Sequence, residues 1–220
     1  MTTTANYASI PKTGAVTVST ANTARDGSGT LGVIATATAT AASGTRYDKI
    51  VTQATGTTTA GMMRFYITKG VPGIAITSIT FVGTTATVTT SASHGRTTGD
   101  KITLQGAFPD NYNVTDTAIT VTGATTFTYT MGTAPTINAS TLGSYSSTTA
   151  SPTSYLWREV PVTAITPSGS VQAFTNTMSS TSSADQGYLP LILQAGYSLR
   201  CAPNNAETFN VIALNSGDFA

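Results

Sequence analysis

The sequence predicts an all-β protein, and three features of its composition support this. Charged residues make up 9% of the chain, whereas an ordinary soluble domain has about 25%. Thr takes about a fifth of the positions and suits the pleated surface of a sheet. The chain has 20 glycines but lacks long stretches of the helix formers Leu, Glu, Lys and Ala.

The expected elements follow from short alternating runs between small-residue turns. Residues 1–12 are expected to form an extended N-terminal arm, because they hold few core-forming side chains and Pro11 opposes regular structure. After the arm, apolar and polar residues alternate as they do in half-buried strands. The expected strands cover 15–19, 31–36, 46–54, 62–68, 155–163, 170–178, 188–193, 197–202 and 208–214.

Two breaks in this pattern predict an inserted domain. The sequence GVPG occupies 70–73, and a linker of small polar residues, SYSSTTASPTS, occupies 144–154. We expect strands 62–68 and 155–163 to be neighbours in one sheet, with residues 74–150 forming a small separate β-barrel or sandwich between them. Residues 13–70 and 151–220 then form one discontinuous domain. Its eight or nine strands fit a jelly-roll-like β-sandwich.

The richest motif lies within the expected insert. It runs HGRTTGDKITLQGAFPDNYNVTDTAITVTGATTFTYTM from His94 to Met131. Its glycines permit backbone conformations that other residues reach only with strain, and its alternating apolar pairs mark strands. The segment resembles a small immunoglobulin-like β module of tailed-phage virion proteins, although Arg96 and Val114 replace the usual Leu and Gly. The resemblance implies outward-facing loops, with His94, Arg96, Asn111, Tyr112 and Asn113 as the candidate contact residues.

The flanking segments resemble head-decoration (cement) proteins of tailed phages. The resemblance rests on GTRYDKIVTQATGTTTAGMMRFYI, LWREVPVTAITPSGSVQAF and LILQAGYSLRCAPNNAETFNVIAL. It implies a capsid-surface β-sandwich, often a trimer, in which a final hairpin around residues 203–206 joins the last two strands. The candidate capsid or subunit contacts are Tyr7, Ile10 and Pro11 of the arm, together with Trp157.

Four other motifs suggest chemistry, and each also has a plain structural interpretation. Residues 27–32 match the glycine fingerprint of dinucleotide sites, but a strand-like run follows where a helix is required. His94 and Cys201 are the single histidine and cysteine, and the pattern places them in different domains, so we expect no catalytic pair.

The loop DNYNVTD, residues 110–116, offers oxygen donors that calcium would accept, or it forms an Asx-stabilised turn. Asp48 and Glu159 would face each other as paired carboxylates if their strands were neighbours. The alternatives are a pair with Lys49 or Arg158, or exposure to solvent.

Aromatic residues offer one more candidate surface. Tyr155 and Trp157 are expected on one face of a strand, while Tyr112, Phe127 and Tyr129 lie in the insert. If these rings were exposed to solvent, they would stack on a sugar ring. Otherwise, aromatic residues at this spacing belong to a core or to a subunit interface.

The expected function is that of a non-enzymatic virion protein that decorates and stabilises the outer capsid surface. Its expected partners are the major capsid protein, further copies of itself as a trimer, and a weakly bound host-surface glycan. The alternative is a receptor- or carbohydrate-binding module of a tail fibre, baseplate or neck. We expect no catalytic residue, cofactor or metal. A net charge of +1 gives no basis for binding nucleic acid or acidic membranes. With no signal peptide expected, synthesis in the host bacterial cytoplasm would precede assembly on the virion.

Overall fold

The structure is a computed structural model that describes residues 8–185 and 187–219, apart from 38–43. Strands make up 56% of it, and the helical element among the described residues is one short 3-10 turn, so the all-β prediction is confirmed. The chain divides into two compact units. Lys69–Pro152 form one of them, and the segments before and after form the other.

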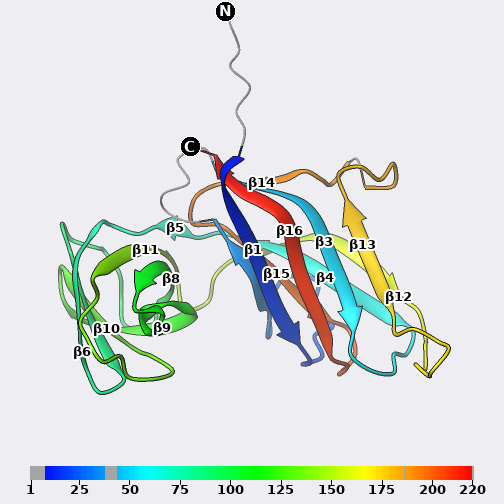
Figure 1. Cartoon of the computed structure of the whole chain (residues 1–220), viewed down its shortest axis with the longest axis horizontal. Coiled ribbons are helices and arrows are strands. Elements are labelled where there is room, and N and C mark those ends of the chain that lie inside the picture. Colours follow the sequence, from blue (N-terminus) through cyan, green and yellow to red (C-terminus); the bar gives the residue numbers. More distant parts are fainter. Residues whose placement is uncertain (1–7, 38–43, 186, 220) are drawn as a thin grey trace, which may run out of the picture. The chain divides into compact units, whose positions relative to one another are not determined.

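The unit built from both ends of the chain is a sandwich of two antiparallel sheets (Figure 1). One sheet has the order β1-β16-β3-β13, with β14 also paired to β3, and the other has the order β12-β4-β15-β2. Successive long strands alternate between the sheets until β4 and β12 pair with each other, which is the jelly-roll path. The bounds are β1 Ala8–Val18, β2 Gly32–Thr36, β3 Thr45–Ala54, β4 Gly61–Thr68, β12 Ser154–Val162, β13 Thr175–Ser179, β14 Leu191–Leu193, β15 Ser198–Pro203 and β16 Phe209–Phe219.

The two sheets bury one apolar core between them. Met63 and Phe65 alternate along β4, and Ile50 and Val211 face the core from the other sheet, all with no exposed surface. Full burial of a large apolar side chain contributes about 1.5–3 kcal/mol. The period-two pattern that predicted the strands thus also selects the side chains that hold the sheets together.

The insert is a single antiparallel sheet of seven strands that curls around its own core (Figure 1). The strand order is β5-β11-β8-β9-β10-β7-β6. Phe127 and Tyr145 pack edge to face in this core, with ring centroids 5.4 Å apart. The bounds are β5 Val71–Pro72, β6 Ile76–Val82, β7 Thr85–Thr90, β8 Lys101–Phe108, η1 Asp110–Tyr112, β9 Val114–Gly123, β10 Thr126–Thr130 and β11 Thr141–Thr148.

Part of the expected N-terminal arm is a strand of the sandwich. Residues 8–12 begin β1 and pair with β16, where Pro11 lies opposite Gly217. β1 is the edge strand of its sheet. The missing backbone N–H of Pro11 therefore interrupts no hydrogen-bond ladder on the outer side of β1. Pro11 is exposed. Tyr7 and the side chain of Ile10 lie outside the described residues.

Two expectations about strand neighbours have opposite outcomes. β4 and β12 are antiparallel neighbours, with Thr68 opposite Ser154 and Gly61 opposite Val162, which confirms the predicted pairing across the insert. The expected final hairpin is wrong, because β15 and β16 belong to different sheets. The Asn-rich loop between them crosses from one sheet to the other, and the Asn204 N–H donates to Met62 O on the way.

Candidate functional site

The turn at His94 points inward, so its prediction as an outward-facing residue is wrong. The imidazole is 5% exposed and meets Phe127 edge to face at 5.4 Å. Its Nε2 lies 3.0 Å from Gly123 O, and its Nδ1 accepts from the Arg96 N–H at 3.0 Å. Gly95, with a φ of 61°, reverses the chain so that the ring folds back onto the sheet. His94 therefore holds this turn in place.

The DNYNVTD loop uses its polar side chains to support the insert itself. Tyr112 is fully buried, which also contradicts its predicted outward position, because its ring fills the core and its hydroxyl donates to Ile137 O. The Asn113 amide bonds both the N–H and the carbonyl of Ala107, and Asn111 Nδ2 donates to Thr133 Oγ1. Arg96, Asn111 and Asn113 are partly exposed.

The same loop shows no acidic cluster. Asp116 pairs with Lys101 at 3.2 Å, and no three His, Cys, Asp or Glu residues of the described chain gather as a metal site would require. The Asn113 amide bonds the backbone of Ala107, six residues earlier, so it stabilises the loop by a longer-range contact than the expected Asx turn.

The glycine-rich segment 27–32 leads into β2, so the helix that a dinucleotide site needs is replaced by a strand. Cys201 lies on β15 in the sandwich core with no exposed surface, and burial raises the pKa of its thiol. His94 belongs to the insert, so the two residues are held by different units. A cavity of about 130 Å³ borders Cys201, well below the roughly 300–1,000 Å³ of typical small-molecule sites.

The expected carboxylate pair does not form, because Asp48 lies on β3 and Glu159 on β12, in different sheets. Asp48 pairs with Arg46 at 2.7 Å, and Glu159 with Arg64 at 2.8 Å. The predicted partners, Lys49 and Arg158, are also wrong for these contacts. Arg158 instead pairs with Asp185 at 2.6 Å.

A bulge separates the two aromatic residues expected on one face of β12. The register passes from Leu156 opposite Tyr66 to Arg158 opposite Phe65, so Trp157 is an extra residue. Trp157 turns against Phe65, at a centroid distance of 6.4 Å, while Tyr155 remains 58% exposed. Tyr112, Phe127 and Tyr129 are buried in the insert, as a core interpretation predicts.

The strongest candidate interaction surface runs along β12 and the end of the β13–β14 connection; we call it the β12 flank. Tyr188 lies against Trp157 at 6.1 Å, and the Arg158 guanidinium sits 4.3 Å from its ring centre. β13 and β14 occupy the neighbouring edge of the other sheet. Tyr188 is exposed here, and so are Tyr155 and Leu156 along β12.

A second exposed apolar surface lies at one end of the insert. The connection from Met131 to Ser140 bonds the β6–β7 turn through Thr84 O and the end of β8 through Phe108 O. Val82, Phe108 and Ile137 are 84%, 57% and 51% exposed around it. We call this surface the distal rim. It lies at one end of β8 and β11. The pairing of Val71 with Ser147, near which the chain enters and leaves the unit, lies at the other end.

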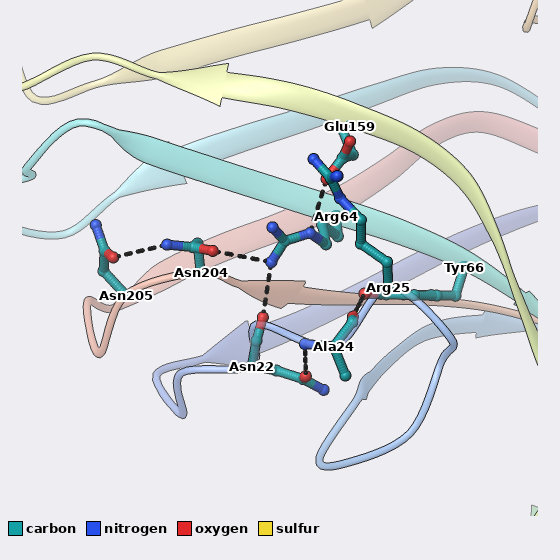
Figure 2. Close-up of polar contacts among 8 residues, drawn as sticks. All are labelled: Asn22, Ala24, Arg25, Arg64, Tyr66, Glu159, Asn204 and Asn205. Atoms are coloured by element: carbon teal, nitrogen blue, oxygen red, sulfur yellow. Dashed lines mark hydrogen bonds and ion pairs between the residues drawn. The ribbon is translucent and has the colours of Figure 1, made fainter.

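Sequence analysis missed a buried polar cluster that surrounds Arg64 on β4 (Figure 2). Arg64 is 5% exposed; its Nη1 donates to Asn22 O at 2.9 Å and to Asn204 Oδ1 at 3.0 Å. Its Nε donates to Glu159 Oε1 at 2.8 Å, and this bond holds the pKa of the Glu159 carboxyl below its ordinary value. An arginine within the apolar run MMRFYI was the available signal.

Comparisons with protein-family models, with curated proteins and with solved structures found no match. No helix among the described residues is long and apolar enough to cross a membrane.

Proposed function

We propose that this chain is a non-enzymatic structural protein of a tailed-phage virion, which binds the outer capsid surface as a homo-oligomer and stabilises the head. The sequence resemblance to head-decoration proteins suggests the class, and a jelly-roll sandwich is compatible with it. The trimeric state and the major capsid protein as partner come from that resemblance.

The β12 flank is the observation that carries the proposal. Trp, Tyr and Arg are the residue types that concentrate binding energy in protein interfaces, and all three meet at Tyr188. Asp185 already neutralises Arg158 at 2.6 Å, so a partner can cover this contact without leaving an unpaired charge. The flank therefore combines exposed apolar surface with little electrostatic cost of burial.

Heads that lack this protein provide the direct test. Purified protein should co-sediment with them saturably and raise their melting temperature. Replacing Tyr188 by Ser should weaken binding by roughly tenfold or more, since it removes the exposed ring at the centre of the flank. Val82→Ser is the matched control, because Val82 is exposed on the insert. Failure to co-sediment, with unchanged head melting, would contradict the proposal.

The distal rim favours a second candidate, a receptor- or carbohydrate-binding module. Phe108 offers an exposed ring at the end of β8. Asn111 on η1 donates to Thr133 on the Met131–Ser140 connection, and this connection is fixed by backbone hydrogen bonds. Rings flanked by amides and hydroxyls suit neutral sugars. A glycan array should then show binding that Phe108→Ala removes and Tyr188→Ser retains.

A further inference from the structure

The connection between β1 and β2, residues 19–31, covers the outer face of the sheet β12-β4-β15-β2; we call it the strap. Along β4, Met63 and Phe65 face the core, so Arg64 and Tyr66 face away from it. Both are nevertheless buried, at 5% and 0% exposure. The Tyr66 hydroxyl donates to Ala24 O at 2.6 Å, which places the strap directly over this face (Figure 2).

Hydrogen bonds rather than apolar burial hold the strap in place. Most of its residues are exposed, and Asn22 is its one buried member. Asn22 Nδ2 donates to Ser28 O at 2.8 Å and its Oδ1 accepts from Ala24 N–H, so this side chain shapes the strap from within. An element secured this way opens at a lower free energy than the packed core does.

One carboxylate links the strap to the sheet. Glu159 Oε1 accepts from Arg64 Nε at 2.8 Å and from Arg25 Nε at 3.1 Å (Figure 2). Arg25 belongs to the strap and its side chain is 65% exposed, whereas the Arg64 side chain is 7% exposed. Arg64 reaches Asn22 O on the strap and Asn204 Oδ1 on the β15–β16 loop as well. Its guanidinium therefore connects three segments that are distant in sequence.

We propose that the strap is a releasable cover with Arg64 as its latch, which opens while the sandwich stays folded and uncovers Arg64 and Tyr66. Opening removes the contacts of Asn22, Ala24 and Arg25 with the sheet but leaves the core between the sheets intact. The cover is a conformational device of the sandwich and does not depend on what the β12 flank binds.

Limited trypsin digestion of the full chain tests the latch, because Arg25 is a cleavage site inside the strap. A protease needs a locally opened segment, so the cleavage rate after Arg25 reports opening. We expect Arg64→Met to raise that rate about tenfold or more, a change that loss of several hydrogen bonds from one charged group can produce. Far-UV circular dichroism and cooperative melting should persist.

Arg46→Met is the matched control, because Arg46 pairs with Asp48 on β3, in the sheet that the strap does not cover. Equal cleavage after Arg25 in the two variants would overturn the proposal. If Arg64→Met fails to fold, Glu159→Gln is the second variant. It removes the negative charge that Arg64 and Arg25 share, and it should also raise the cleavage rate after Arg25.

Hydrogen exchange of the unaltered protein is an independent test. Strap amides such as those of Ala24 and Ser28 should exchange faster than those of the core strands. Exchange of the strap amides only with global unfolding would contradict a releasable cover.

Discussion

Cys201 illustrates how position decides the chemistry of a residue. The thiol lies between Met63, Phe65 and their neighbours in the sandwich core, with no exposed surface, and burial raises its pKa. The thiolate is the reactive form, so both access and ionisation oppose reaction. The residue behaves as a small apolar core side chain.

We therefore predict that the native protein resists thiol reagents at pH 8 and that labelling appears only when denaturant unfolds it. Cys201→Ser should lower the free energy of unfolding by about 1–3 kcal/mol, because it buries a hydroxyl in place of the thiol. Denaturant titration measures this loss. Rapid labelling of the folded protein would show that the core opens at this position.

The Asp185 carboxyl should make the free energy of unfolding depend on pH in the acidic range. Burial opposes its ionisation and is the largest single influence, but bonds from the Ser179 N–H and Arg158 together hold its pKa below the ordinary 3.8. A carboxyl whose pKa is lower in the folded state than in the unfolded state stabilises the protein at pH values above the unfolded pKa. That stabilisation is lost as the pH falls through the folded pKa. Asp185→Asn should thus be less stable at pH 7, and the difference should shrink below about pH 4.

Urea midpoints between pH 7 and pH 3 test this prediction. Asp110→Asn is the control, because Asp110 lies exposed on the insert and an amide keeps a side-chain oxygen as acceptor for Asn113. A constant difference between Asp185→Asn and the unaltered protein across this range would show that the carboxylate charge does not matter.

At the scale of elements, the alternation of apolar and polar residues predicts roughly where the strands lie, but specific contacts decide where each strand begins and ends. The expected strand at 170–178 begins at Thr175, because Ser168 and Val171 bond each other in a preceding turn. The expected strand at 188–193 begins at Leu191, after Pro190, which lacks an N–H for a ladder. The bulge at Trp157 left no signal in the sequence, since an extra residue preserves the apparent alternation on either side.

The strap depends on Gly27, whose φ is 79°. A Cβ there would lie 2.5 Å from Ser154 O, so Gly27→Ala adds both backbone strain and a collision with backbone. We expect the free energy of unfolding to fall by about 1–3 kcal/mol. Gly56→Ala is the control, because a Cβ at Gly56 meets no atom within 4 Å, and its effect should stay within about 0.5 kcal/mol. Similar losses in thermal or urea unfolding for both variants would contradict the packing of the strap on β12.

At the scale of the whole molecule, pairing between distant segments sets the limit of sequence reasoning. Composition and alternation predict the all-β class, and the breaks near 70 and 150 predict the insert, which the structure places at Lys69–Pro152. Local turn signals cannot show whether a loop closes a hairpin or crosses between sheets. The same limit explains the missed contacts of Arg64, which join residues 42 and 140 positions away.

Excision of the insert tests the independence of the sandwich. Thr68 and Ser154 are paired across β4 and β12, and their hydroxyls lie 2.8 Å apart. A short Asn-Gly turn between these residues should therefore close a hairpin and leave a soluble β protein that melts cooperatively. Loss of β circular dichroism or of solubility would show that the sandwich requires the insert.

A reconstruction of the intact phage particle by electron microscopy tests the central claim most directly. The proposal predicts jelly-roll density on the outer surface of the head, with the β12 flank buried against a capsid subunit or another copy. Density at a tail fibre or baseplate, or a particle that lacks this chain, would contradict it.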